Sequence, residues 1–509
     1  MKKASSRNES LDKWLTATVI VLRMVVGATF IFSGFVKAVD PYGLAYKLQD
    51  YFVAFGVYDW GVLSPKALDL LSLPSAVLLA AFEFIWGVYT FFGSYRRVTP
   101  WLLLAFMAVM TPLTLYLAIA DPVHDCGCFG EALILTNWQT FGKNLFLLAA
   151  VVVLLYFNTK VRSLYTNEVQ WVTGFFSLFF LLYISWVGIY RQPILDFRPY
   201  KVGTDIAEAM LADDGTDEFV FVYEKEGKRA EFTLENLPDA ESGWTFVERH
   251  ARSKSRSWLP KKPGIEDFSV FKGEEEVTLD LLEDDNYSFW LLLPDIEYAS
   301  DAEIDKINEL YDYSREYGYR YYCLTAGASE AVQTWCENTG AEYPVLFMDR
   351  TTLRTIARGN PVMLVMKSGV IYHKIAPTNI PDETQLDKPW EEIDYYGNPD
   401  TYSVSSRVGL LVAIYLFPML FLLMTEKTVV MIIHRVRYVR RRRFWKRYRT
   451  LRRELHLKHQ HAVPVENGTA AGEEREEVKH TDADNICGSA EEEEKPAETD
   501  EKEKQDDNK

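Results

Sequence analysis

Six apolar stretches of about 20 residues constrain the fold of this chain more than any other feature. They lie near residues 14–36, 73–93, 100–120, 141–157, 169–190 and 408–424. A helix needs about 20 residues to cross the hydrocarbon core of a bilayer. The sequence therefore predicts a multi-pass α-helical membrane protein, with six spans in a chain of 509 residues.

The distribution of lysine and arginine predicts how these spans are oriented, because short loops rich in these residues stay in the cytoplasm. Basic residues precede the first span and follow the second, fourth and sixth spans: Lys2, Lys3, Arg7 and Lys13; Arg96 and Arg97; Lys160 and Arg162; Arg435, Arg437, Arg440 to Arg443, Lys446 and Arg447. We expect a bacterial inner (cytoplasmic) membrane, both termini in the cytoplasm, and residues 191–407 in the periplasm. The first span lacks a small-residue cleavage site, so we expect a retained helix rather than a cleaved signal peptide.

The connection between the third and fourth spans carries the candidate chemistry, in the sequence Asp125-Cys126-Gly127-Cys128-Phe129-Gly130. Two cysteines at i and i+2 form a disulfide only where the backbone bends sharply, and Gly127 permits that bend. Strained disulfides are the exchange-active ones. We therefore interpret Cys126 and Cys128 as a catalytic redox pair. Two alternatives stay open: a structural staple or idle thiols, and a Cu(I) or zinc site that includes His124.

Two charged residues within the predicted spans are candidates for a buried pair. Arg23 lies in the first span and Glu83 near the middle of the second. Ionisable groups in the hydrocarbon region are costly and tend to pair, so we predict an Arg23–Glu83 ion pair. The alternative is that Arg23 extends to the cytoplasmic interface while Glu83 is protonated. Residues 42–57 are apolar but too short to cross, and we expect an interfacial amphipathic helix.

These features together resemble the DoxX superfamily and, within it, the methylamine utilisation protein MauE branch. The resemblance covers about residues 13–158 and rests on Arg23, the small-residue turn at 27–34, Lys37 with Asp40-Pro41, Glu83 with Gly87, and the Asp-Cys-Gly-Cys-Phe-Gly segment. It implies a four-helix membrane bundle related in architecture to quinone-linked thiol oxidoreductases, and a part in maturing a disulfide-rich periplasmic dehydrogenase.

The resemblance also implies roles for particular residues. Cys126 and Cys128 would be the redox pair, Arg23 and Glu83 structural or close to a quinone, and Lys37 a further binding residue. Quinone is accordingly the candidate cofactor. This chain departs from the family by a fifth span, a large insert, a sixth span and a charged tail. We therefore carry over the redox mechanism but not the methylamine substrate.

The insert between the fifth and sixth spans divides into two predicted units. A hairpin with strands at 219–224 and 229–234 and a turn at Gly227 begins a small unit over 196–252, and a linker follows at 253–264. Strands expected at 288–293, 319–324, 344–348 and 363–367 alternate with helices at 301–316 and 329–338. We expect Ser300 and Glu303 to form a capping box and Gly318 to end the first helix. Alternation of this kind predicts an α/β unit with a mostly parallel core.

The order of these elements is similar to a thioredoxin-like domain of the TlpA type, over about residues 264–380. Asn360-Pro361-Val362 matches the cis-proline position, whereas Glu297-Tyr298-Ala299-Ser300 replaces the Cys-x-x-Cys pair. The resemblance implies a thiol-free binding platform on which an extended client could pair near Pro361. Cys323 and Cys336 are expected to be buried thiols, and a disulfide between them is left open.

The C-terminal region, 435–509, follows the sixth span at 406–434 and is basic and then acidic. Its basic part favours membrane lipid over nucleic acid as a partner, and beyond Val465 we expect disorder. Two functions remain at this point. One is an envelope oxidoreductase acting on a client protein with thiols, and the other is a non-enzymatic, membrane-anchored assembly or interaction protein. The oligomeric state is not predicted.

Overall fold

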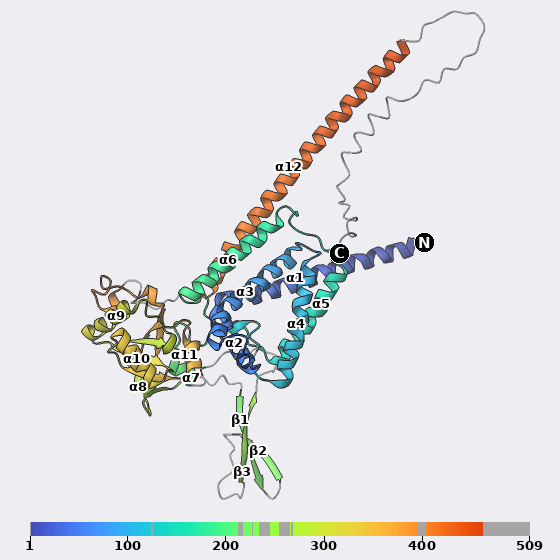
Figure 1. Cartoon of the computed structure of the whole chain (residues 1–509). Coiled ribbons are helices and arrows are strands. Elements are labelled where there is room, and N and C mark those ends of the chain that lie inside the picture. The colour runs from blue at the N-terminus through green and yellow to red at the C-terminus, as the bar shows by residue number, and fades with distance from the viewer. Residues whose placement is uncertain are drawn as a thin grey trace, which may run out of the picture. The chain divides into compact units, whose positions relative to one another are not determined.

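Residues 2–123, 126–211, 217–225, 228–233, 245–253, 265, 268–393, 396 and 404–461 are described by the computed structural model (Figure 1). Side chains are described within 12–123, 126–210, 265, 268–393, 396, 404–455 and 457. Six helices in this part of the chain are long and apolar enough to cross a membrane. They are α1 (Lys2–Val39), α3 (Pro65–Phe92), α4 (Thr99–Ala120), α5 (Asn137–Tyr156), α6 (Gln170–Tyr190) and α12 (Val404–His461). The prediction of a multi-pass helical membrane protein is confirmed.

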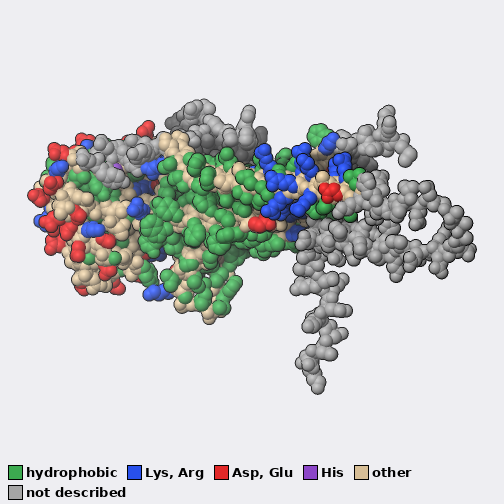
Figure 2. Space-filling view, turned by 90° about the horizontal axis from the view of Figure 1, so that it is seen from above, with side chains coloured by type: hydrophobic (Ala, Val, Ile, Leu, Met, Phe, Trp, Pro, Cys, Tyr) green, Lys and Arg blue, Asp and Glu red, His purple; other side chains and the backbone are tan. Residues whose placement is uncertain are grey.

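Glycines set the close packing of α1 against α3. A Cβ atom placed on Gly34 would lie 2.5 Å from the backbone nitrogen of Phe84, and one on Gly27 would lie 2.7 Å from that of Phe91. A larger residue at either position would force the helices apart. On the other side of α1, α4 packs on α5 around a core of Phe30, Leu103, Met107, Leu147 and Val151. Figure 2 shows hydrophobic side chains spread over the surface of these helices, as expected for contact with lipid.

A short helix, α2 (Pro41–Ala54), follows α1 after a break at one residue. Asp40 is its N-cap and accepts a hydrogen bond from the backbone N–H of Gly43, while Pro41 occupies the first turn. The predicted helix in this region is therefore confirmed. Short 3-10 helices lie at η1 (Val57–Trp60), η2 (Gly130–Ala132), η3 (Asn158–Lys160), η6 (Ile296–Tyr298), η7 (Pro377–Asn379) and η8 (Trp390–Glu392).

A seven-stranded mixed sheet forms the α/β domain, with the order β10-β9-β6-β7-β8-β4-β5. Its strands are β4 (Val270–Lys272), β5 (Glu275–Glu276), β6 (Tyr287–Leu293), β7 (Arg320–Thr325), β8 (Val345–Met348), β9 (Val362–Lys367) and β10 (Val370–Ile375). The pairs β6–β7 and β7–β8 are parallel, and the remaining neighbours in this sheet are antiparallel. The predicted parallel core corresponds to β6, β7 and β8. Antiparallel strands flank it, because β9 turns directly into β10 as a hairpin and β4 enters against β8.

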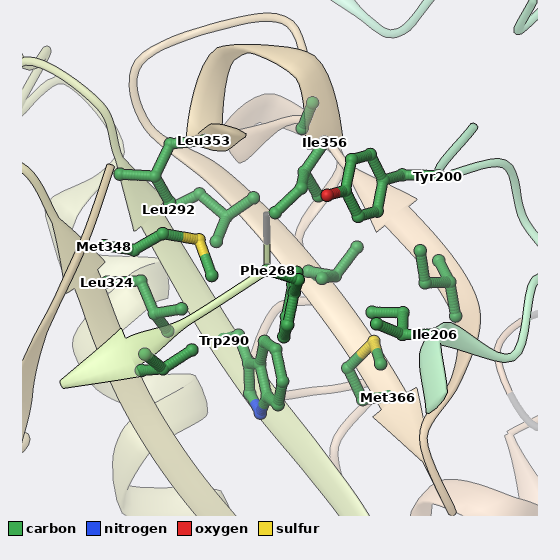
Figure 3. Packing of buried hydrophobic residues seen from close by; sticks show 14 of the residues in the cluster. Tyr200, Ile206, Phe268, Trp290, Leu292, Leu324, Met348, Leu353, Ile356 and Met366 are labelled. Carbon is green, nitrogen blue, oxygen red and sulfur yellow. The ribbon is translucent and has the colours of Figure 1, made fainter. Parts of the chain in front are cut away.

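Strand β6 lies at the centre of the domain and is buried on both faces. Trp290 and Leu292 pack into one core with Phe268 and Leu324, shown in Figure 3. The alternate residues, such as Phe289, pack into a second core on the opposite face of the sheet. Successive side chains on a strand point to opposite faces, so burial on both sides explains the uninterrupted apolar run in the sequence.

The helices of this domain are α7 (Ile206–Leu211), α8 (Thr278–Leu282), α9 (Ile304–Tyr317), α10 (Ser329–Thr339) and α11 (Arg350–Ile356). Gly318 ends α9 in the left-handed conformation, as predicted. The capping box predicted at Ser300 and Glu303 was wrong: Glu303 is the N-cap without a side-chain cap bond, and the Ser300 N–H donates to the Asn360 carbonyl at 3.1 Å. Helix α11 has seven residues and was not predicted.

A separate antiparallel sheet has the order β2-β1-β3 and consists of β1 (Asp217–Lys225), β2 (Lys228–Thr233) and β3 (Thr245–Ser253). The predicted hairpin is confirmed by the β1–β2 pairing. Strand β3 was not predicted, because its charged residues hide the alternation. The turn at Gly227 and most of the predicted linker lie outside the described residues.

The chain divides into compact units at Met1–Val430 and Met431–Lys509. Helix α12 continues through the basic residues to His461, and this continuation was not predicted from the sequence. Long runs of arginine and lysine have good helix propensity, which favours this continuation. The predicted disorder beyond Val465 concerns residues outside the described part.

Candidate functional site

The two sulfur atoms of the loop between α4 and α5 are in contact. Cys126 Sγ lies 3.1 Å from Cys128 Sγ, and both cysteines are free. Gly127 between them has a φ of 65°, a conformation that favours glycine and produces the predicted bend. A disulfide bond is about 2.0 Å long, so the sulfurs need to approach by about 1 Å for one to form.

Hydrogen bonds to neighbouring helices hold this loop in place. The carbonyl oxygen of Cys128 lies 2.7 Å from the hydroxyl of Ser33 on α1. The carbonyl of Cys126 accepts a hydrogen bond of 2.9 Å from the hydroxyl of Tyr51 on α2. Both cysteines are therefore positioned through their backbone, which leaves the sulfurs available for chemistry.

A buried ion pair lies beneath the loop. Lys37 Nζ is 2.7 Å from each oxygen of the Glu83 carboxylate, and the two side chains are 3% and 4% exposed. The Ser33 hydroxyl lies 2.7 Å from Glu83 Oε2. Because Ser33 also contacts the Cys128 carbonyl, a continuous polar connection joins the ion pair to the cysteine loop. Breaking a buried pair of this kind leaves an uncompensated charge and is strongly destabilising.

The predicted Arg23–Glu83 ion pair was wrong. Arg23 Nη1 donates to the backbone carbonyl of Arg162 at 2.8 Å, and Glu83 pairs with Lys37 instead. Lys37 lies about 20 Å further along α1 than Arg23, at a rise of 1.5 Å per residue. The close contact of α1 with α3 places Glu83 at the same level along the bundle as Lys37. The sequence feature that could have identified Lys37 as the partner of Glu83 is its i, i+4 spacing from Ser33, which contacts both residues.

The two thiols of the pair differ in acidity. The hydrogen bond from Cys126 lowers the pKa of the Cys128 thiol to about 6, against the opposing effect of burial, and the ammonium groups of Lys143 and Lys37 lower it further. The same hydrogen bond, together with burial, raises the pKa of Cys126. Cys128 is therefore the thiolate of the pair near neutral pH, and a thiolate is the form that attacks or leaves in exchange. Lys143 was not predicted as a site residue.

The cysteine loop lies between two cavities. One, of about 20 Å³, is lined by Gly127 and Gly130 of the loop, by polar residues such as Lys37 and Lys47, and by the segment at 193–198 that follows α6. The second, of about 30 Å³, is lined by Cys128 and by residues of α1, α4 and α5. Each has room for little more than one water molecule, and charged side chains are more numerous around the first than around the second.

Ion pairs of Arg358 with Asp40 and, at 3.9 Å, with Glu131 join the α/β domain to the helical bundle. Arg358, which follows α11, contacts both oxygens of Asp40, with Nε at 3.0 and 2.9 Å. Arg358 also lies over the ring of Tyr46, with 5.5 Å to the centroid. Burial alone would raise the pKa of Asp40, but the guanidinium of Arg358 outweighs it and lowers that pKa below its ordinary value. Sequence reasoning missed this contact because the partners are 318 positions apart.

The Asn360–Pro361 peptide bond is cis and Pro361 is buried. Strand β9, which follows it, is paired on both sides by β10 and β6. The expected open strand edge is therefore not present along β9, and binding through the Pro361 loop itself stays a prediction.

His124 lies outside the described residues. Within the described ranges, no group of three metal-ligating side chains occurs.

The cysteines of the α/β domain lie on β7 and α10. Cys323 is fully buried, as predicted, and burial raises the pKa of its thiol. Cys336 is only half-buried, so the expectation of two buried thiols was wrong for this residue. Both are free, and the disulfide left open by the sequence is not formed.

Comparison with known proteins gives two matches to family models. Residues 15–157 match the model for methylamine utilisation protein MauE, and residues 217–254 match a domain of unknown function (DUF8463). No curated protein matches the chain. The first match covers the helices that build the cysteine loop and its surroundings, and it supports a MauE-like membrane protein over that region.

Proposed function

We propose that this membrane protein is a thiol–disulfide oxidoreductase in which Cys126 and Cys128 exchange a disulfide with the thiols of a client protein. The observation that carries the proposal is the contact of 3.1 Å between the two sulfurs, with the pKa of Cys128 lowered to about 6. The match to MauE supports a membrane protein linked to methylamine utilisation. The redox role rests on the loop geometry.

The exchange begins with the Cys126–Cys128 disulfide. A client thiolate attacks Cys126 Sγ, the S–S bond breaks, and Cys128 leaves as a thiolate, because the thiol of lower pKa is the better leaving group. A second client thiolate attacks the client sulfur of the mixed disulfide and displaces Cys126, which takes up a proton. The client gains a disulfide and loses two electrons. To close the disulfide again, the Cys126 thiol and the Cys128 thiolate would pass two electrons to an oxidant of the quinone class, which would take up one proton from Cys126 and one from solvent.

Lys37, Glu83 and Ser33 are positioning residues in this proposal. They hold the Cys128 carbonyl through the 2.7 Å contact with Ser33, and the loop therefore keeps its sulfurs close during the cycle. Preorganised geometry of this kind lowers the entropic cost of closing the small ring. The ion pair also keeps the charge beneath the loop neutral overall.

The proposal includes a cellular location for the protein. We place the protein in a bacterial inner membrane, with the cysteine loop and the α/β domain on the periplasmic side, where disulfides persist. The client is an envelope protein with thiols, and membrane lipid surrounds the apolar helices. We also infer that the α/β domain is thioredoxin-like, because a cis proline precedes β9 and the central strands run in the order β10-β9-β6-β7.

A non-enzymatic assembly role is the second candidate. It is favoured by the absence of cysteine at 297–300, where a redox-active thioredoxin-like domain carries its thiols. Under this alternative, the α/β domain would hold a partner and the cysteine loop would serve as structure.

Thiol trapping in intact cells separates these functions. A variant that keeps Cys126 and Cys128 but has serine at 323, 336 and 487 would be treated with a membrane-permeant maleimide mass tag, with quinone present or depleted. We expect the pair to be oxidised in the first condition and reduced in the second. A pair that keeps one redox state in both conditions, and that does not respond to added thiol or disulfide, would overturn the redox function.

A further inference from the structure

A cavity of about 180 Å³ lies where helix α6 ends and helix α12 begins. Residues 192–194, just after α6, form one wall, and Val404 and Arg407 in the first turn of α12 form another. The rest of the lining includes Lys201 and residues of strand β10. One water molecule needs about 10–15 Å³, so this cavity has room for a polar group much larger than water.

The cavity lies at the level of the lipid headgroups. Helices α6 and α12 are both long and apolar enough to cross a membrane. They lie side by side, because the hydroxyl oxygens of Ser177 and Tyr415 are 2.7 Å apart. At the cavity, Arg407 Nη1 donates a hydrogen bond of 3.1 Å to the Ile194 carbonyl and so joins the start of α12 to the segment after α6. Both helices therefore reach the same face of the membrane at this point.

Positive charge exceeds negative charge around the cavity. Three lining residues are cationic: Lys201, Lys374 and Arg407. Asp196 is the single carboxylate among the lining residues that the structure describes. Arg198 already binds both oxygens of Asp196, with Nε at 2.7 Å and Nη2 at 2.9 Å, and Lys374 Nζ lies 2.8 Å from Oδ2. One carboxylate thus serves two cations whose side chains are 2% and 4% exposed.

The pKa of Lys374 shows that Asp196 does not fully compensate these two cations. Burial and the guanidinium of Arg198 lower the pKa of Lys374 to about 7, although Asp196 acts in the opposite direction. The ammonium also donates to the Ile356 carbonyl, which carries no full charge. A buried cation is costly unless it is paired. An anion in the cavity would supply the missing negative charge and favour the ionised form of Lys374.

We propose that this cavity binds a phosphate group, and that the headgroup of an anionic phospholipid supplies it. Lysine and arginine bind phosphate oxygens through charge-assisted hydrogen bonds. A soluble phosphate would use the same cations. The lipid is favoured because the ends of two spanning helices border the cavity and because Val404, an apolar lining residue, is 44% exposed there. The proposal goes beyond thiol exchange and does not depend on it.

The test measures phospholipid binding to the full-length protein in detergent by native mass spectrometry. Phosphatidylglycerol is the anionic probe, and phosphatidylcholine, whose headgroup has no net charge, is the comparison. We expect phosphatidylglycerol to bind the wild type more tightly than phosphatidylcholine. Lys201→Met and Arg407→Gln should each weaken the first phosphatidylglycerol by about fivefold, and together by about 25-fold, because each removes one cation from the anionic group.

Arg191→Gln is the matched control, because Arg191 is exposed directly after α6 but is not among the residues that line the cavity. It should leave the affinity for phosphatidylglycerol within about twofold of the wild type. Lys201 is exposed, so Lys201→Met should unfold at the wild-type temperature even if Arg407→Gln does not fold.

A second readout needs no variant. Phosphatidylglycerol with a diazirine next to its headgroup should photolabel peptides that contain residues 192–202 or 404–407, and unlabelled phosphatidylglycerol should compete.

Two outcomes would contradict the proposal. Equal phosphatidylglycerol binding in the wild type, the double variant and Arg191→Gln, with labels spread over the spanning helices, overturns the site, because the lipid is then held by apolar surface alone. If inorganic phosphate binds the wild type but not the double variant, and phosphatidylglycerol neither binds selectively nor labels the cavity, the lipid source is overturned and the ligand is a soluble phosphate.

Discussion

The cysteines of the loop between α4 and α5 and those of the α/β domain have different surroundings. Cys126 and Cys128 lie in a loop with their sulfurs 3.1 Å apart, and hydrogen bonding lowers the pKa of Cys128 to about 6. Cys323 is enclosed in the core of the α/β domain, where burial raises its pKa. Residue type alone does not distinguish Cys128 from Cys323. The difference between their pKa values comes from burial, one hydrogen-bond donor and a few nearby charges.

The comparison shows what makes a thiol reactive here. Burial by itself favours the neutral thiol, because a thiolate in an apolar site lacks solvation. Cys128 and Cys336 are both half-buried, yet the pKa of Cys336 is raised and that of Cys128 is lowered, because the neighbours of Cys128 include a sulfhydryl donor and two ammonium groups. Reactivity in this chain therefore depends on which groups face the sulfur rather than on exposure.

Serine substitutions give the largest expected difference between the pairs. Cys126→Ser or Cys128→Ser should reduce thiol–disulfide exchange by about 100-fold or more, because one sulfur of the disulfide is lost. Cys323→Ala should leave the exchange rate within about twofold, since its thiol is enclosed. The measurement is the rate at which a dithiol peptide is oxidised by protein in nanodiscs. Comparable losses in all three variants would remove the distinction.

The ion pair beneath the reactive cysteines gives the next largest effect. Lys37→Met should destabilise the bundle by about 3–5 kcal/mol, because Glu83 would be left buried and unpaired. The double variant Lys37→Met with Glu83→Leu should recover much of that loss. Thermal unfolding in detergent, with maleimide accessibility of Cys128 as a second readout, provides the test. If the single variant unfolds like the wild type, the ion pair does not support the loop.

The pH dependence of alkylation gives the smallest effect. The Cys128 pKa is lowered to about 6, so the rate of its reaction with iodoacetamide should rise about tenfold from pH 5 to pH 7 and then level off. Cys336 has its pKa raised by burial, so its reaction should still be increasing at pH 9. Mass spectrometry of reduced protein resolves both sites. A Cys128 rate that climbs through pH 9 would contradict the lowered pKa.

Local and periodic features of the sequence were sufficient to predict much of the fold. The spans follow from apolar length, and strand β6 and helix α10 follow from composition and turn residues. Gly318 predicted the end of α9 because a left-handed residue there favours glycine. These predictions succeed because the relevant forces act within about a dozen residues.

The candidate site was only partly predictable, because its partners come from distant segments. Cys126 and Cys128 are adjacent in sequence and were identified from it. The Lys37–Glu83 pair depends on how α1 lies against α3, which in turn depends on Gly34 and its contact with Phe84. Estimating depth from position within each span placed Arg23 opposite Glu83. Side-chain contacts between helices decide such pairings, and single-chain periodicity does not encode them.

The ion pair between Asp40 and Arg358 has a consequence for the timing of synthesis. Its partners are 318 positions apart, and a ribosome adds about 5–20 residues per second. Arg358 is therefore made about 15–60 s after Asp40. In the part of that interval that follows the synthesis of Cys128, the cysteine loop exists without the α/β domain attached to the bundle. A newly made chain thus has a period in which its thiols can be oxidised before the domain docks.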